Sequence, residues 1–323
     1  MRILISKDSF LKEAKNAKHQ PNIVLQILIF LGVFIVSQIP GSIIVGIFAW
    51  LQVINKVPKN FNNTDMTVVM DLVMNAMASR EVVIVSLFAT VFVTFLAILY
   101  CKKIEGRSLK SMGFAKKNAM KQYLIGLLIG FFMFSVCVGI CMATGALQYG
   151  GIVIGGNFIF VILFFFGFLF QGMSEEVLLR GYFMVSLSNK VPIVAAIMIN
   201  SIVFACLHLM NSGISILAFV NLIGFGVFAS IYTMKTNNLW GICAIHSMWN
   251  FVQGNFFGIL VSGQDTNASI FKFVSTHDGI LINGGDFGLE GGLAVSIVLV
   301  LATVITLFLN TNKNQEEIRK EYA

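Results

Sequence analysis

Long apolar segments alternate with shorter polar ones along the 323 residues of this chain. A helix needs about 20 mostly apolar residues to cross a bilayer, and eight segments come close to that length or exceed it. They cover about 22–54, 81–101, 122–147, 156–187, 191–210, 215–234, 239–258 and 292–310. The pattern predicts an all-α fold, a polytopic transmembrane bundle of about eight helical spans.

The composition supports this interpretation. Hydrophobic residues make up 57% of the chain and charged residues 11%, with a mean hydropathy of +0.86. Soluble domains carry roughly 25% charged residues, so we expect an integral, multi-pass membrane protein. The five cysteines include no CxxC pair, and we expect neither disulfides nor a zinc–cysteine cluster.

The distribution of basic residues predicts the orientation. Seventeen of the 22 Lys and Arg residues fall in the termini and loops that eight spans place on one side, and four fall on the other. The last one, Arg180, lies within an apolar segment. Because Lys and Arg are retained on the cytoplasmic side, both termini are predicted to be inside. This clustering accounts for the pI near 9.2 without nucleic acid as a partner.

Three ionisable residues interrupt the apolar segment 156–187: Glu175, Glu176 and Arg180. Charges in the hydrocarbon region are costly, so these side chains should face the bundle interior. Glu176 and Arg180 are four residues apart and stack on one helix face, whereas Glu175 points about 100° away from Glu176. Arg180 can then pair with Glu176 and leave Glu175 free for chemistry. A purely structural ion pair is the alternative.

Two later spans also carry polar residues at membrane depth. His208 follows Phe204 by four residues, and His246 and Asn250 are four apart, on one helix face. Such groups usually converge inside one bundle. With straight helices, however, the depths of Glu175, His208 and His246 differ by up to about 15 Å. Convergence therefore requires tilted or broken helices, or different helix boundaries.

In chain order, E-E-x-x-x-R at 175–180, F-x-x-x-H at 204–208 and H-x-x-x-N at 246–250 resemble the CPBP family. These are the CAAX-protease and bacteriocin-processing membrane enzymes, also called the Abi family. The segment 106–114, GRSLKSMGF, resembles the lead-in to the family's core. The resemblance covers roughly 106–258. It implies an intramembrane endopeptidase in which the first glutamate of the pair is catalytic.

The residue chemistry fits peptide hydrolysis, which needs an activated water, a stabilised oxyanion and a protonated leaving amine. A carboxylate in an apolar environment is a stronger base than one in water. We therefore expect Glu175 to take a proton from water and His208 to hold that water. His246 and Asn250 would donate to the oxyanion, while Glu176, Arg180 and Phe204 support the site.

A metal-dependent mechanism is the rival interpretation. Glu175, His208 and His246 form a possible two-histidine, one-carboxylate set that could hold zinc. The local zinc-protease motif HExxH is absent from the sequence, and the resemblance does not decide between the two mechanisms. We favour a glutamate-activated water and no cofactor.

The domain division follows from these assignments. Residues 1–121 hold the N-terminal segment, two spans and a basic cytosolic loop; 122–258 form the CPBP-like catalytic core; 259–323 form an outer loop, a last span and a tail. Because His246 lies near the inner end of its span, we expect substrate to reach the site from the cytosolic side, or laterally from that leaflet. The membrane would be the plasma membrane in a bacterium or the ER membrane in a eukaryote.

The resemblance implies a small, membrane-associated peptide or protein substrate. Candidates are a prenylated C-terminus or a bacteriocin, pheromone or leader peptide. Two other functions stay open at this point. One is a non-catalytic bacteriocin-immunity or regulatory protein of the same fold, and the other is a transporter whose buried charges relay protons.

Overall fold

The structure, a computed structural model, describes residues 10–57 and 66–308. Its helices are α1 (Phe10–Ala14), α2 (Ile23–Val53), α3 (Met66–Met77), α4 (Arg80–Ala89), α5 (Val91–Lys103), α6 (Ala119–Ala143), α7 (Phe158–Glu176), α8 (Met184–Ser188), α9 (Ile193–Cys206), α10 (Ile216–Thr236), α11 (Trp240–Phe251), α12 (Ile280–Asn283) and α13 (Leu293–Phe308). Two π-helical segments, Val177–Phe183 and Val252–Phe256, continue α7 and α11. The strands are β1 (Leu147–Ile152) and β2 (Phe271–Ser275).

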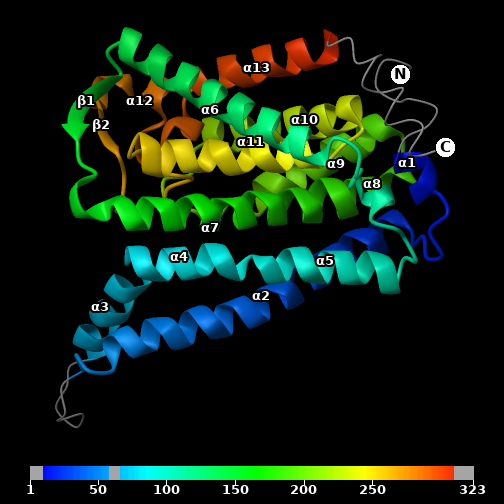
Figure 1. Ribbon diagram of the computed structural model, residues 1–323, viewed down its shortest axis with the longest axis horizontal. Coiled ribbons are helices and arrows are strands. Elements are labelled where there is room, and N and C mark those ends of the chain that lie inside the picture. The colour runs from blue at the N-terminus through cyan, green and yellow to red at the C-terminus, as the bar shows by residue number, and fades with distance from the viewer. Residues whose placement is uncertain (1–9, 58–65, 309–323) are drawn as a thin grey trace.

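The long helices run side by side (Figure 1). Helix α7 lies between α11 on one face and α4–α5 on the other, with α2 beyond α4–α5. Helices α6 and α13 pack over α11 and α10 on the opposite side. This arrangement confirms the all-α helical bundle and places the polar motif of α7 near its centre.

Within residues 10–57 and 66–308, five helical segments are long and apolar enough to cross a membrane: Ile23–Val53, Arg80–Lys103, Ala119–Ala143, Gly155–Ser188 and Ile216–Thr236. The other three predicted spans correspond to the shorter α9, α11 and α13. Residues 309–323, which include the end of the last predicted span and the tail, lie outside the described residues. The count of eight and the orientation of the termini stay predictions.

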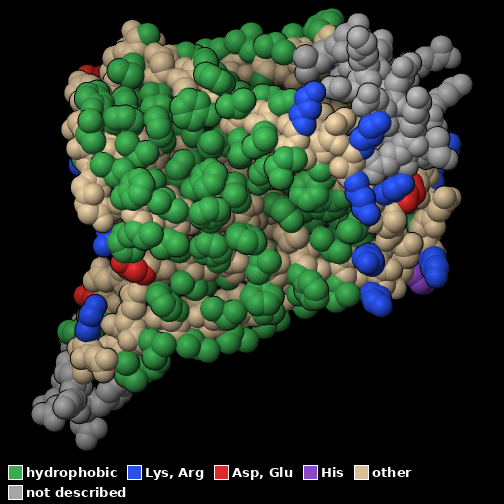
Figure 2. Space-filling view, in the orientation of Figure 1, with side chains coloured by type: hydrophobic (Ala, Val, Ile, Leu, Met, Phe, Trp, Pro, Cys, Tyr) green, Lys and Arg blue, Asp and Glu red, His purple; other side chains and the backbone are tan. Residues whose placement is uncertain are grey.

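The surface has an apolar belt. Figure 2 shows hydrophobic side chains across the middle of the visible face, with Lys and Arg gathered at the end where α1 and α8 lie. That end carries the 102–121 loop, which the charge pattern places in the cytosol. The opposite end carries β1, β2 and α12.

This opposite end differs from what the sequence predicts. The segment after α6 and the long 259–291 loop were expected to be a turn and a polar loop, but they pair as the antiparallel strands β1 and β2. Much of the rest of the loop folds back onto the bundle: Gly263 N donates to the Phe287 carbonyl at 2.9 Å, and Phe287 and Leu289 are fully buried. The loop therefore forms part of the core.

The lead-in segment anchors the other end of the bundle. Arg107 and Glu105 form a buried ion pair at 2.9 Å, with side-chain exposures of 0% and 1%. Arg107 also donates to the carbonyls of Gly181 and Tyr182, at 2.8 and 3.4 Å. Ser186 joins the pair, because its hydroxyl lies 2.9 Å from both carboxylate oxygens of Glu105. The segment thus fixes the end of the π-helical turn that follows the α7 motif.

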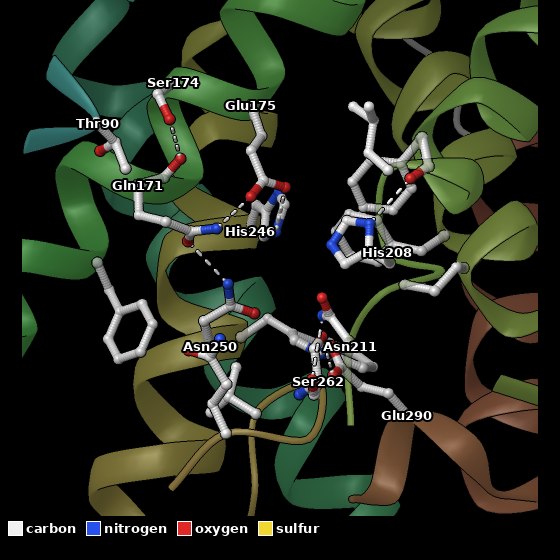
Figure 3. A pocket seen from close by; sticks show the side chains of 18 of the residues that line it. Thr90, Gln171, Ser174, Glu175, His208, Asn211, His246, Asn250, Ser262 and Glu290 are labelled. Carbon is white, nitrogen blue, oxygen red and sulfur yellow. Dashed lines mark hydrogen bonds and ion pairs between the residues drawn. The ribbon is translucent and has the colours of Figure 1, made fainter. Parts of the chain in front are cut away.

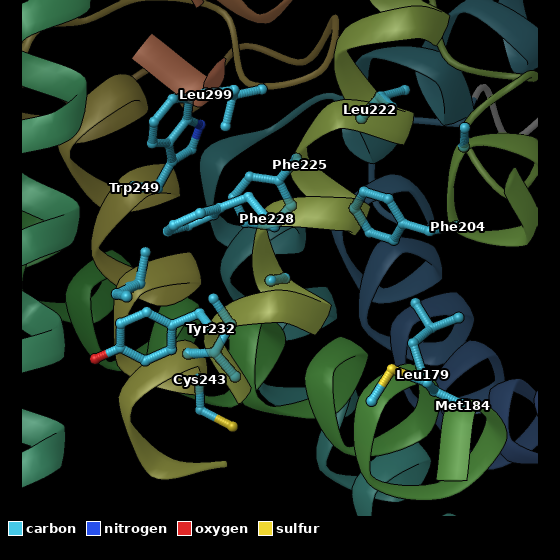
Figure 4. Packing of buried hydrophobic residues seen from close by; sticks show 14 of the residues in the cluster. Leu179, Met184, Phe204, Leu222, Phe225, Phe228, Tyr232, Cys243, Trp249 and Leu299 are labelled. Atoms are coloured by element: carbon cyan, nitrogen blue, oxygen red, sulfur yellow. The ribbon is translucent and has the colours of Figure 1, made fainter. Parts of the chain in front are cut away.

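The buried apolar core lies beside the polar residues of α7 and α11. Phe204, Phe225, Phe228, Trp249 and Leu222 pack together from α9, α10 and α11 (Figure 4). Their rings are in contact, for example at a centroid distance of 5.9 Å and an interplanar angle of 58° between Phe225 and Trp249. This aromatic wall holds α9, α10 and α11 in fixed positions around one cavity.

Candidate active site

A cavity of about 500 Å³ opens in the middle of the bundle. Its lining includes all four candidate catalytic residues, Glu175, His208, His246 and Asn250, together with Phe204. Figure 3 shows Glu175, His246 and Asn250 on one side of the cavity and His208 across from them. The three motifs therefore line one cavity, although their outermost residues, Glu175 and Asn250, are 75 positions apart in the sequence.

The predicted ion pair between Glu176 and Arg180 is present. Arg180 Nη1 lies 3.0 Å from Glu176 Oε1, and both side chains are 0% exposed. The Arg180 guanidinium carbon also lies 4.8 Å from the centre of the Phe204 ring, a cation–π contact. Because both charges are completely buried, each depends on its neighbours for stabilisation.

His246 lies between the two glutamates. Its Nδ1 is 2.8 Å from Glu176 Oε1, and its Nε2 is 3.7 Å from Glu175 Oε2. A carboxylate only accepts hydrogen bonds, so Nδ1 carries a proton and donates to Glu176. The buried pair therefore also sets the orientation of the His246 ring.

Close backbone contact brings His246 to this position. A Cβ atom on Gly172 of α7 would lie 2.6 Å from the backbone nitrogen of Ser247, so only glycine allows α11 to approach this closely. On the other side of α11, a Cβ on Gly130 of α6 would lie 2.5 Å from the Ile245 carbonyl oxygen. The glycines on both sides of α11 thus fix the distance between His246 and the glutamates.

Glu175 is held by an amide network. Gln171 Nε2 donates to Glu175 Oε1 at 2.5 Å, and Asn250 Nδ2 donates to Gln171 Oε1 at 2.9 Å. The second oxygen of Glu175, Oε2, is buried, has no hydrogen-bond partner among the described residues and lies 3.7 Å from His246 Nε2. The Glu175 side chain is 27% exposed, in contrast to that of Glu176 at 0%. Of the two carboxylates, Glu175 is the one that reaches the cavity.

His208 faces the cavity from the end of α9. Its Nδ1 lies 2.9 Å from the Phe204 backbone oxygen. A carbonyl oxygen only accepts, so Nδ1 carries the proton and Nε2 of the neutral ring is a hydrogen-bond acceptor. Phe204 also packs at a tilt against His208 and edge-on against His246, at centroid distances of 4.7 and 6.2 Å. Phe204 thus contacts Arg180 and both histidines.

The helix boundaries explain how residues at different expected depths meet. Helix α9 has 14 residues and ends at Cys206, where the sequence predicted a span to about 210. At 1.5 Å per residue it is about 21 Å long, shorter than a hydrocarbon core of about 30 Å. His208 therefore lies in the turn after α9, and Asn211 of this turn donates to the Ser262 carbonyl of the 259–291 loop at 3.1 Å.

Several lining residues were not predicted from the sequence. Gln171 lies four residues before Glu175, and this spacing was an available signal. Asn211, Ser262 and Glu290 come from the α9–α10 turn and the 259–291 loop. Nothing in the local sequence marks these loop residues, because their position depends on how the loop folds back.

The exposed residues of the cavity lining come from two places. Gln264 and Asp265 belong to the 259–291 loop, and Gln38 belongs to α2. Among the described lining residues, none comes from the 102–121 loop or from the turns around Lys190 and Lys235. Entry of the substrate from the cytosolic side, or laterally from that leaflet, stays a prediction.

The proposed zinc ligands do not form a metal site in this arrangement. Within residues 10–57 and 66–308, no group of three His, Cys, Asp or Glu side chains is placed to hold a metal ion. His246 directs its two ring nitrogens at two glutamates, and His208 lies across the cavity. We therefore derive no catalytic step through a metal.

The fold and site define a polytopic helical membrane protein with a polar, carboxylate-containing cavity. Residues 157–252 match a family model described as type II CAAX prenyl endopeptidase Rce1-like. The match spans less than a third of the chain and contains all three motifs, so it confirms the CAAX-protease resemblance over that segment. It supports a CAAX-type protease fold with a membrane-associated peptide or protein substrate. The chain has no match among curated proteins and none among solved structures.

We expect Arg180→Leu to lower the amount of protein in the membrane more than Glu175→Gln does. Removing Arg180 leaves the Glu176 carboxylate buried without its cation, which costs about 3–5 kcal/mol in soluble proteins. Glu175 is partly exposed and lies outside this pair. Protein abundance and thermal unfolding in detergent test the difference, and equal values for the two variants would contradict a stabilising role for the pair.

We expect a cysteine at Asp265 to react with a membrane-impermeant maleimide added to intact cells. The matched control is a cysteine at Lys102, an exposed residue at the other end of the bundle, which should react only after the cells are opened. Both are made in a Cys206→Ala background, because Cys206 is the exposed native cysteine. The reverse labelling pattern would place the cavity rim in the cytosol.

Proposed function

We propose that the chain is an intramembrane endopeptidase that hydrolyses a peptide bond with a water activated by Glu175. The observation that supports this most is the difference between the two adjacent glutamates. Glu176 is fully buried against Arg180 and His246, whereas the Glu175 side chain is 27% exposed and lines the cavity of about 500 Å³. The family match over 157–252 supports protease chemistry at this site.

In the proposed reaction, Glu175 removes a proton from water as the water oxygen attacks the peptide carbonyl carbon. His208 holds that water through the acceptor Nε2. The carbonyl oxygen becomes an oxyanion, the C–N bond then breaks, and Glu175 returns the proton to the leaving nitrogen. The products are a carboxylic acid and an amine, which become a carboxylate and an ammonium once the acid proton is transferred, so no oxidant, reductant or further reactant is needed.

His246 and Asn250 are the proposed oxyanion donors. When His246 is protonated, both ring nitrogens donate, Nδ1 to Glu176 and Nε2 toward Glu175. Once Glu175 has accepted the proton from water, it attracts the Nε2 hydrogen less, and that hydrogen can turn to the oxyanion. One N–H of the Asn250 side-chain amide donates to Gln171 Oε1, and the second N–H remains available for the substrate.

A non-catalytic immunity or regulatory protein is the second candidate. It would need a peptide-binding cavity but no free base within it. The Glu175 carboxylate, ordered by Gln171 and close to His246, favours the enzyme, because simple peptide binding does not require this arrangement.

We expect Glu175→Gln to abolish hydrolysis while the protein stays in the membrane at its normal level. Glutamine keeps the shape but cannot accept a proton from water. The assay incubates purified protein in detergent with prenylated C-terminal peptides and leader-type peptides, and mass spectrometry identifies the products. Glu81→Gln is the control, because Glu81 is a half-exposed carboxylate paired with Arg80 and lies outside the cavity lining. Residual Glu175→Gln activity above a few per cent would remove Glu175 from the base role.

We expect activity to survive complete removal of metal by chelation. His208→Ala and His246→Ala should each lose activity about 100-fold or more, the scale of losing one oxyanion donor. Metal analysis of the purified wild type and both variants decides between the mechanisms. One tightly bound zinc in the wild type that is missing from both variants, with activity restored by zinc, would overturn the metal-free mechanism.

A further inference from the structure

The charged side chains that line the cavity indicate which kind of substrate it favours. Among the described lining residues, three are carboxylates and none is Lys or Arg. The carboxylates are Glu175, Asp265 and Glu290. Arg180 does not offset them, because it is fully buried and paired with Glu176. Even with His208 and His246 both protonated, the lining keeps a net negative charge.

The Glu290 carboxylate is fixed in place. Its Oε1 accepts a hydrogen bond from Trp249 Nε1 at 3.3 Å. Its Oε2 accepts from the backbone N and the hydroxyl of Ser262, at 2.8 and 2.7 Å, and from Gln253 Nε2 at 3.4 Å. These donors are all neutral, so they stabilise the carboxylate without cancelling its charge. Glu290 therefore presents a fixed negative charge to the cavity.

The cavity is small enough for these charges to act on any occupant. A sphere of 500 Å³ is about 10 Å across, which is about the Debye length at 0.1 M salt. Two like charges about 10 Å apart, at an effective dielectric constant near 20, weaken binding on the order of tenfold. A negative group in this cavity is therefore repelled from more than one direction.

The rest of the lining is mostly apolar and aromatic. Phe168, Phe204, Phe225, Leu178 and Trp249 surround the polar residues. Apolar side chains of a peptide can bury surface against them. The cavity thus combines contacts for apolar side chains with repulsion of a carboxylate.

We propose that the substrate places an internal peptide segment, neutral or basic and with apolar side chains, in the cavity, and that Glu290 and Asp265 select against a free C-terminal carboxylate there. The proposal rests on the proposed peptidase function and names its substrate class. In a CAAX-type C-terminus only three residues separate the cysteine from the terminal carboxylate, and three extended residues span about 10 Å. A cut beside the cysteine would put that carboxylate in or at the rim of this cavity. A leader-type or bacteriocin-type peptide, cut well inside its chain, avoids this repulsion.

The test uses three N-acetylated hexapeptides of Ala, Leu and Phe that differ only at the C-terminus: a free acid, an amide, and an amide with lysine as the last residue. Binding is measured with purified His208→Ala protein, which keeps all three carboxylates and is expected to cleave the peptides at least about 100-fold more slowly than the wild type. We expect the free acid to bind at least about tenfold more weakly than the amide, and the lysine peptide to bind as well as the amide or better. The difference should shrink in high salt.

Two variants made in the same His208→Ala background test whether Asp265 and Glu290 cause the preference for the amide over the free acid. Asp265→Asn and Glu290→Gln should each reduce the acid-to-amide difference several-fold, whereas Asp71→Asn, which removes an exposed carboxylate on α3, should leave it unchanged. If Glu290→Gln fails to fold, Asp265→Asn at the exposed rim still gives the result. Equal or tighter binding of the free acid, no effect of the folded lining variants, or no binding of any peptide would overturn the proposal.

Turnover by the wild-type protein is measured separately. The substrates are the three hexapeptides and the prenylated C-terminal and leader-type peptides of the hydrolysis assay. Binding in the predicted order without cleavage of any peptide would overturn the peptidase function and leave the charge preference standing. Cleavage of the free acid as fast as the amide would overturn the charge preference and leave the peptidase function standing.

Discussion

The Glu176 carboxylate has no contact with water, and the Arg180 guanidinium beside it is equally buried. A charge in this position is stable only if its partners are fixed, and here those partners are Arg180 and His246. The geometry of the cavity follows from this constraint. The Arg180 guanidinium makes a cation–π contact with Phe204, and the Phe204 ring packs against His208. Glu176 accepts a hydrogen bond from His246 and so orients its ring. Glu175, the neighbour outside the pair, is 27% exposed and lines the cavity.

The sequence predicts the parts of this arrangement that are local. The i,i+4 spacing of Glu176 and Arg180 predicts their ion pair, and the cost of polar groups in a membrane predicts that His246 and Asn250 face inward. Most of the helix positions follow from hydropathy, and the family match over 157–252 confirms the resemblance that the motifs suggested. The catalytic roles of these residues rest on chemistry and stay proposals.

The parts that depend on contacts distant in the chain were not predicted. The early end of α9 at Cys206 has no marker in an apolar sequence, yet it places His208 in the turn after the helix and not within the helix itself. Glu290 lies in a Gly-rich loop that was assigned to the solvent, and it reaches the cavity only because the loop folds back over the α9–α10 turn. Similarly, Arg107 belongs to a basic loop, but its partners Gly181 and Tyr182 lie more than seventy residues away.

The central claim is that water, activated by Glu175, attacks the peptide bond directly. A single turnover in ¹⁸O-labelled water, with enzyme in excess over a cleaved peptide, tests this claim most directly. Direct attack predicts one ¹⁸O atom in the new carboxylate of the product after the first turnover. A first-turnover product with only ¹⁶O, together with ¹⁸O in the Glu175 side chain, would show that the glutamate itself attacks the substrate and would contradict the account.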